Sequence, residues 1–305
     1  MRDALSSRLS MAADRDPRIM VVTGDHGYAL FDEFRRRHPD KYLNAGIAEQ
    51  NMVGLAAGLA RGGFRPIVYG LSAFVPIRVL EQIKLDIAHD ELPVLLLGDG
   101  AGFVYSHLGT SHQSTEDIAC LRAVPNASIF SPADAAELDA CFDLALEGGG
   151  TVYMRIGKAD RGSVHDAPLA GYRSGDLVPV HRPGGADFAL IATGSMVSTA
   201  ARVARNFQGG AVWSVPTIKP LNAEQLVAAA AGLRVVFTIE EHSVLGGLGA
   251  AVAEILSERA QTRVIRIGVE DRFSKYCGSY EYLLREHGLD DEAIGARIRA
   301  TLEGC

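Results

Sequence analysis

The chain has 305 residues, of which 48% are hydrophobic and 22% charged, an ordinary balance for a globular protein that can bury its own core. Its formal net charge is −7 and it has no basic block, which excludes a nucleic-acid partner or an anionic membrane surface. The four cysteines lack metal-ligand spacing, and no stretch is apolar enough for a signal peptide or a membrane span. We therefore expect free thiols, no metal held by this chain and a cytoplasmic protein.

Short apolar runs alternate with amphipathic segments along the first half of the chain, a pattern typical of parallel β/α units. Strands are predicted at 19–23, 42–45, 65–69, 93–97, 128–130 and 151–155. Helices are predicted at 48–60, 79–88 and 133–146. Residues 100–114 are predicted to form a long polar loop without periodicity. Long loops of this kind in a compact domain often have a function.

Residues 161–186 are rich in Gly, Pro and charged residues, and we interpret them as a linker. The linker separates a first domain, 1–160, from a second domain, 187–305. Further strands are predicted at 188–193, 211–215, 235–239 and 264–267, with a closing helix at 292–302. The predicted fold class is α/β, with two domains that each contain a mostly parallel sheet flanked by helices.

Residues 44–52 read NAGIAEQNM and place one acid, Glu49, at the start of a predicted helix. An acid in the first turn is ordinarily a response to the helix dipole. The nine-residue string, however, resembles the motif of transketolases and deoxyxylulose-phosphate synthases. That resemblance implies that Glu49 contacts the aminopyrimidine ring of thiamine diphosphate and activates the cofactor, with Ile47 as a further cofactor contact. A carboxyl group that donates a hydrogen bond to this ring favours the tautomer whose exocyclic nitrogen serves as the base.

Residues 69–82, YGLSAFVPIRVLEQ, carry a second resemblance to the transketolase family. An aromatic residue after a strand is ordinarily part of the core, but the resemblance implies that Phe74 stacks on the pyrimidine ring. The family often has another aromatic residue three positions earlier, where this chain has Leu71.

Residues 109–118, GTSHQSTEDI, resemble the THQ-x-x-E-D string of the same family. Histidines in polar loops mostly face solvent. The resemblance implies instead that His112 reaches the reacting substrate carbons as a hydrogen-bond donor and proton shuttle. His26 and His107 are near matching segments but have no such support, and we expect both to face solvent.

Several positions depart from the substrate contacts usual in the family. Leu108 replaces an Asp that binds a sugar hydroxyl, Gly98-Asp99-Gly100 lacks a phosphate-binding His, and Ala29 replaces a Ser. Arg2 and Arg155 are implied counterparts of two phosphate-contacting arginines. Because a site that loses a hydroxyl-binding carboxylate disfavours a polyol, we hypothesise two-carbon ketol transfer from a ketose to an acceptor other than the usual aldose phosphate.

The resemblance covers the last two domains of a transketolase and leaves out the first, which binds the diphosphate. The chain begins with Met, so we expect a separate subunit of a split transketolase. Its expected partner is the N-terminal transketolase subunit, which would hold Mg²⁺ or Ca²⁺ and the diphosphate, in an α2β2 assembly. Gly98-Asp99-Gly100 with Asn126 imitates the family's metal motif, but these residues align with the pyrimidine-side domain, and we expect no metal there.

Three alternatives are open at this point. A β subunit of a 2-oxo acid dehydrogenase has the same two domains, although the GIAEQNM and THQ strings favour transketolase. A deoxyxylulose-phosphate synthase is usually one long chain. A non-catalytic scaffold subunit of the same fold would have no need to retain Glu49, Phe74 and His112 together.

Overall fold

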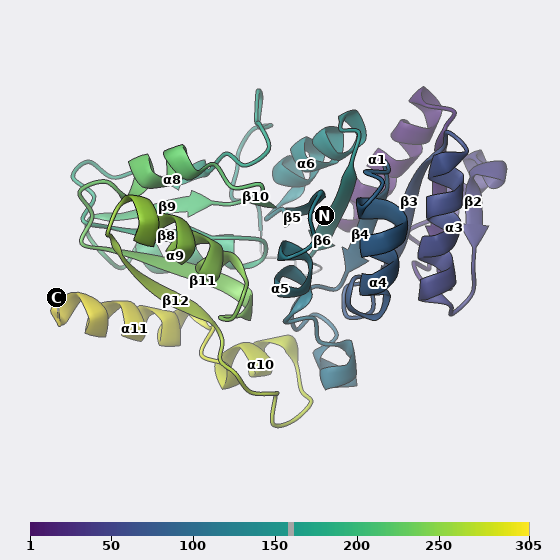
Figure 1. The fold of residues 1–305 in the computed structure, drawn as a ribbon. Coiled ribbons are helices and arrows are strands. Elements are labelled where there is room, and N and C mark those ends of the chain that lie inside the picture. The colour runs from purple at the N-terminus through teal and green to yellow at the C-terminus, as the bar shows by residue number, and fades with distance from the viewer. Residues whose placement is uncertain (158–161, 305) are drawn as a thin grey trace.

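The computed structural model describes residues 1–157 and 162–304, so the domain boundary predicted at residue 160 lies outside the described residues. Figure 1 shows two adjoining lobes, one for each half of the sequence, and each lobe is built around its own sheet. This arrangement confirms the predicted fold class.

The first sheet has seven strands in the order β10-β5-β6-β4-β3-β1-β2. Its strands are β1 (Ile19–Thr23), β2 (Tyr42–Asn44), β3 (Arg65–Leu71), β4 (Leu95–Asp99), β5 (Ala127–Phe130), β6 (Thr151–Ile156) and β10 (Thr217–Lys219). All pairings are parallel except that of β10 with β5. The continuous apolar runs are explained by this topology, because helices cover both faces of the sheet and leave neither face to solvent.

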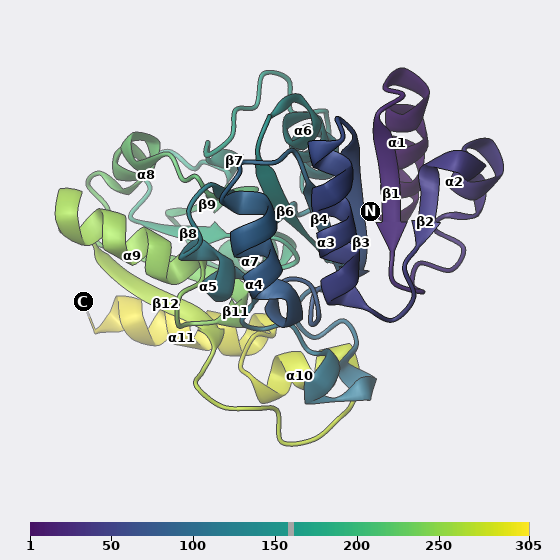
Figure 2. The same ribbon diagram turned by 45° about the vertical axis from the view of Figure 1, so that its right-hand side comes forward.

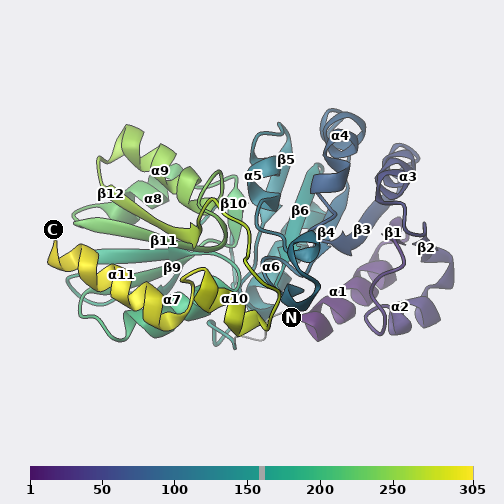
Figure 3. The same cartoon turned by 90° about the horizontal axis from the view of Figure 1, so that it is seen from below.

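The helices of the first lobe form two layers, which Figure 3 shows on opposite sides of the sheet. One layer holds α1 (Arg2–Arg15), α2 (Asp32–Arg37) and α6 (Ala135–Glu147). The other holds α3 (Glu49–Arg61), α4 (Leu80–Gln82), which continues as a π-helical segment (Ile83–Ala88), and α5 (Asp117–Arg122). Among the helices of both lobes that the structure describes, none is long and apolar enough to cross a bilayer.

The second sheet has five strands in the order β12-β11-β8-β9-β7. They are β7 (Val178–His181), β8 (Phe188–Ala192), β9 (Gly210–Ser214), β11 (Val235–Ser243) and β12 (Arg263–Val269). The helices α8 (Ala223–Ala230) and α9 (Leu248–Arg259) lie on one face, and α7 (Met196–Ala204) and α11 (Asp291–Glu303) lie on the other (Figure 3). A further helix, α10 (Tyr280–Glu286), precedes α11.

Two short strands depart from the sequence-based picture of two separate units. β7 lies inside the stretch 161–186 that we expected to be a linker, and it pairs antiparallel with β9. β10 follows β9 in the chain but adds an antiparallel edge to the first sheet. One hydrophobic core consequently runs from the α3 face of the first sheet into the second lobe, where it includes Trp213, Leu226 and Val252. The two lobes are joined by a packed core as well as by the chain.

Candidate active site

Glu49 is the first residue of α3, and only 4% of its side chain is exposed. The chain reaches it through a tight turn, in which the Asn44 amide oxygen accepts hydrogen bonds from the backbone N–H groups of Asp25 and Gly46. A carboxylate is favoured at this end of a helix. Its Oε2 lies 3.2 Å from Nη1 of Arg78, while Oε1 is buried and has no hydrogen-bond partner in the described chain. Glu49 therefore has one carboxyl oxygen without a hydrogen-bond partner among the described residues, and this oxygen is available to a ligand.

The Phe74 ring is the centre of a cluster of side chains next to Glu49. Arg78, the ion-pair partner of Glu49, places its guanidinium carbon 4.0 Å from the centroid of this ring. The His112 ring approaches edge-on with the centroids 5.2 Å apart, and the His26 ring is 6.4 Å away. The three segments that carried the resemblance, far apart in sequence, thus meet at one place.

His26 is half-buried, whereas we expected it to face solvent. Its Nε2 is buried and has no hydrogen-bond partner in the described chain. His26 follows β1 and lies near Phe74, because the carboxyl ends of neighbouring parallel strands meet at one edge of a sheet. His107, in contrast, is exposed as expected.

His112 belongs to the segment between β4 and α5, residues 100–116, which we call the histidine loop. It ends a 3-10 turn, Thr110–His112, and its Nδ1 lies 2.9 Å from the hydroxyl oxygen of Ser111. Figure 2 shows α10 of the second lobe beside this loop, in agreement with the packing of α10 on the turn Ser106–Leu108.

A buried carboxylate from the second lobe holds the histidine loop. Glu241, on β11, accepts hydrogen bonds from the backbone N–H of Phe103 and from the hydroxyls of Ser195 and Tyr280. Gly102 has a φ of +65°, and a Cβ at this position would lie 2.2 Å from Oε1 of Glu241. The loop can approach the carboxylate this closely because residue 102 is glycine.

Arg155 fixes the far end of the same loop, and this position argues against the predicted substrate contact. Its side chain is 3% exposed, and its Nε donates to Oδ2 of the fully buried Asp117 at 2.8 Å. Its Nη2 donates to the carbonyl oxygens of Ser114 and Glu241. Because the guanidinium is committed to these protein groups inside the joint between the lobes, the geometry favours a structural role.

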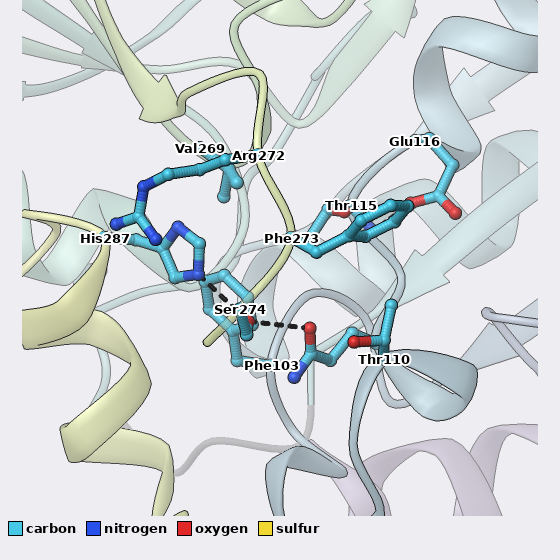
Figure 4. A pocket seen from close by; sticks show the side chains of 10 residues that line it. Phe103, Thr110, Thr115, Glu116, Val269, Arg272, Phe273, Ser274 and His287 are labelled. Carbon is cyan, nitrogen blue, oxygen red and sulfur yellow. Dashed lines mark hydrogen bonds between the residues drawn. The ribbon is translucent and has the colours of Figure 1, made fainter. Parts of the chain in front are cut away.

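A second connection runs through the small pocket shown in Figure 4, at the boundary between the loop and the second lobe. The hydroxyl of Ser274 donates to Oε1 of Gln113 at 2.8 Å and lies 2.9 Å from Nε2 of His287. The His287 ring stacks on Phe103, with the centroids 4.8 Å apart. Gln113 directly follows His112, so the second lobe positions the backbone that carries this histidine.

Arg2, the other predicted substrate contact, is exposed, and its Nη2 donates to the carbonyl oxygen of Tyr28. It lies near a group that the sequence did not suggest, in which the Tyr105 hydroxyl donates to Oδ2 of Asp99 at 2.8 Å. Tyr69 also lies close to Asp99. Burial, followed by the nearby carboxylate, raises the pKa of Tyr69 and of Tyr105 well above the usual range, so both phenols stay protonated donors.

Asp99 is connected to the segment that carries Phe74, because its backbone carbonyl accepts a hydrogen bond from the N–H of Ser72 at 2.8 Å.

A metal site shared by Asp99 and Asn126 would need both residues at one edge of the sheet. Asp99 ends β4, whereas Asn126 precedes β5, and both strands run parallel to β6. The two side chains are therefore at opposite edges, and Asn126 donates instead to the Ala88 carbonyl oxygen.

Ile47, the remaining predicted cofactor contact, is 77% exposed at the turn before Glu49. Leu108 and Ala29, which replace usual substrate contacts, are also exposed. The predicted free thiols are confirmed for Cys120, Cys141 and Cys277, and Cys305 lies outside the described residues.

The residues present fit an aminopyrimidine ring. Such a ring needs an acid beside its ring nitrogen and a flat apolar surface, and Glu49 with its unpaired Oε1 and Phe74 provide both. Sequence reasoning missed Arg78, although it falls within the matched string 69–82, because a single arginine between apolar residues ordinarily extends to solvent.

Comparison with known proteins agrees with this geometry. Residues 1–161 match the family model "Transketolase, pyrimidine binding domain", and residues 177–294 match "Transketolase, C-terminal domain". The 6-deoxy-6-sulfo-D-fructose transketolase subunit SqwH of Clostridium sp. (strain MSTE9) is 34% identical over 99% of this chain and 94% of its own. An apulose-4-phosphate transketolase subunit of Actinobacillus succinogenes is 32% identical over 90% of this chain and 89% of its own. A solved structure described as "Split gene transketolase, inactive beta4 tetramer" superposes with a TM-score of 0.90 at 33% identity, covering 99% of this chain and 98% of that one.

Proposed function

The chain belongs to the transketolase family, and from this membership we propose that it is the pyrimidine-binding subunit of a split transketolase that transfers a two-carbon ketol unit. Membership implies dependence on thiamine diphosphate. The similarity to split transketolase subunits favours this function over a 2-oxo acid dehydrogenase β subunit or a scaffold.

The observation that carries the proposal is the unpaired Oε1 of Glu49. An unsatisfied buried carboxylate oxygen costs stability, about 1–3 kcal/mol or more for a charged group, unless a ligand completes it. Glu49 lies beside Phe74 and His112, and this position supports the cofactor ring, rather than a bound water, as the ligand of Oε1.

Each of the three residues then has a defined task. Thiamine diphosphate, when bound, would supply the carbanion stabilisation that cleavage and formation of the carbon–carbon bond require. Glu49 holds a proton against the ring nitrogen and thereby selects the reactive tautomer. Phe74 supports the ring through stacking, worth about 0.5–1.5 kcal/mol beyond area burial. His112, at the edge of Phe74, donates a hydrogen bond to the sugar oxygens and moves protons there.

The partner subunit would supply the half of the site that this chain lacks. We propose that an N-terminal transketolase subunit holds the diphosphate and Mg²⁺ or Ca²⁺, within an α2β2 assembly in the cytoplasm. Two features support a partner at this place: Ile47 is 77% exposed next to Glu49, and the similar split-gene transketolase is described as inactive in its β4 form.

The substrate is proposed to be a ketose donor with an acceptor other than the usual aldose phosphate. A carboxylate, Asp99, with the phenols Tyr69 and Tyr105 occupies the end of β4, where the family usually has a phosphate-binding His. A carboxylate repels a phosphate and accepts hydrogen bonds from hydroxyl groups. Arg2 is a nearby cation in this region and its role remains a prediction. Acceptor kinetics in which ribose 5-phosphate is the best substrate would contradict this assignment.

The deciding experiment compares wild-type and Glu49→Gln subunits, each assembled with the partner subunit and Mg²⁺. Calorimetric titration with thiamine diphosphate should show stoichiometric binding to the wild type. The variant should bind more weakly and consume ketose at least about 10²-fold more slowly, because Gln cannot hold the acid proton. Equal activity of the two enzymes would refute the role of Glu49.

A further inference from the structure

Arg78 lies where the cofactor ring is expected to lie. Its guanidinium carbon is 4.0 Å from the centroid of the Phe74 ring, and its Nη1 is 3.2 Å from Oε2 of Glu49. It is thus a planar group with N–H donors that rests on an aromatic surface and pairs with a buried acid. Under the proposed function, the aminopyrimidine ring would make the same two kinds of contact.

The two groups cannot stack on the same face of Phe74 together. Arg78 contacts both Phe74 and Glu49, so it covers the face that a ring held by Glu49 would use. Carbon atoms in contact are about 3.5–4.0 Å apart, so a guanidinium at 4.0 Å from the Phe74 centroid leaves no layer for a ring on that face. The Glu49 carboxylate is likewise shared by Arg78 through Oε2, although Oε1 is still unpaired in the described chain.

The side chain of Arg78 is able to leave. It is 48% exposed, so it can turn toward solvent at the cost of its contact with Phe74 and its ion pair with Glu49. Its backbone is held independently, by its N–H to the carbonyl oxygen of Phe74 at 2.9 Å. Movement of the side chain therefore does not require movement of the turn that carries Phe74.

We propose that Arg78 is a displaceable occupant of the ring site, which neutralises Glu49 and covers Phe74 in the subunit without cofactor and leaves when the ring binds. This inference rests on the proposed function. Arg78 competes with the aminopyrimidine ring for the same place. Cofactor binding by the assembled enzyme therefore includes the free-energy cost of breaking the cation–π contact with Phe74 and the ion pair with Glu49. Removal of the side chain should tighten binding by roughly 2- to 30-fold, the range of one such contact.

The test is calorimetric titration of the assembled enzyme, wild type and Arg78→Ala, with thiamine diphosphate and Mg²⁺. A parallel titration uses Mg²⁺-pyrophosphate, which lacks the pyrimidine ring. Displacement predicts that the variant binds thiamine diphosphate more tightly while its pyrophosphate Kd is unchanged. The matched control is Arg61→Ala, which should change neither Kd. Arg61 is 49% exposed, is ion-paired to Asp90, and lies at the end of α3 opposite to Glu49.

The outcomes are distinguishable. An unchanged or weaker affinity for thiamine diphosphate in Arg78→Ala, with a normal melting curve, would overturn the displacement model and make Arg78 inert or a supporting contact of the bound ring. Weaker binding of both ligands would show that Arg78 attracts the diphosphate instead. If the wild-type assembly bound no thiamine diphosphate at all, the proposed function itself would fail.

Discussion

At the scale of single residues, His112 is the group whose role is most open to measurement. Its ring contacts Phe74 from the histidine loop, and its Nδ1 is close to the Ser111 hydroxyl. Replacement by Asn should slow ketose consumption by about 10²- to 10⁴-fold, the usual worth of a positioned proton-transfer group. Thiamine diphosphate affinity, measured by calorimetry on the assembled enzyme, should stay within about twofold because the Glu49–Phe74 pair is intact.

A control for this substitution lies on the same loop. His107 is exposed, and His107→Asn should leave both the rate and the affinity unchanged. A rate loss of equal size in the two variants would indicate damage to the loop and would remove the case for His112.

Glu240 gives a prediction about pH. Its two carboxylate oxygens accept the backbone N–H groups of Leu248 and Gly249 at the start of α9, and His242 lies 3.7 Å away. Burial raises the pKa of Glu240 to about 7, and the two backbone N–H groups oppose this shift. Burial also lowers the pKa of His242 to about 4, although Asp117 opposes this shift, so the imidazole stays neutral.

The folded protein therefore binds more protons at Glu240 than the unfolded chain does between pH 4.5 and pH 7. The contribution of this group to stability is present below pH 4.5 and is lost as the pH rises through about 7. Glu240→Gln abolishes this titration and one backbone hydrogen bond. We predict that the variant melts at a lower temperature than the wild type. This difference in melting temperature should be larger at about pH 5 than at about pH 8.

Thermal unfolding at several pH values checks this prediction. Glu254→Gln, which removes an exposed carboxylate of α9 that is paired with Arg122, should change the melting temperature by little, because exposed ion pairs contribute about 0–1 kcal/mol. A difference for Glu240→Gln that grows toward the alkaline end of the range would contradict the sign.

At the scale of elements, the histidine loop owes its shape to the second lobe. Arg155→Met should lower the free energy of unfolding by about 3–5 kcal/mol, because it leaves Asp117 buried without its ion-pair partner. Arg173→Met, which removes an 85% exposed arginine paired with Asp176, should cost less than about 0.5 kcal/mol. Near-normal stability of Arg155→Met combined with a raised KM for a phosphorylated substrate would instead support the substrate contact implied by the family resemblance.

The regular elements were predictable where periodicity and burial agree. The strands of both sheets follow apolar runs, and the predicted helix at 48–60 is α3 within one residue. β7 and β10 were not predicted, because each is a strand of three or four residues defined by a distant pairing partner rather than by its own pattern. The string 44–52 indicated Glu49 through resemblance. The contacts of Arg78, His26 and Arg155 depend on tertiary geometry that no local pattern contains.

At the scale of the whole molecule, the groups proposed to contact the cofactor ring lie next to an exposed apolar residue. Glu49 has an unpaired oxygen and Ile47 is exposed beside it, while the described residues contain no group of His, Cys, Asp and Glu side chains that could hold a metal. Under the proposed function, a second polypeptide would bind the diphosphate tail of the cofactor, and two-fold symmetry would allow both copies of the site to form in one closed assembly.

Titration of this subunit with its partner, followed by light scattering and by ketose consumption in the same samples, tests this account most directly. We predict that the subunit alone neither binds thiamine diphosphate nor consumes ketose, and that activity rises in proportion to added partner and reaches a plateau at a 1:1 ratio, with a mass of two copies of each chain. Full activity of the subunit alone, or an assembled complex that binds no thiamine diphosphate, would contradict the account.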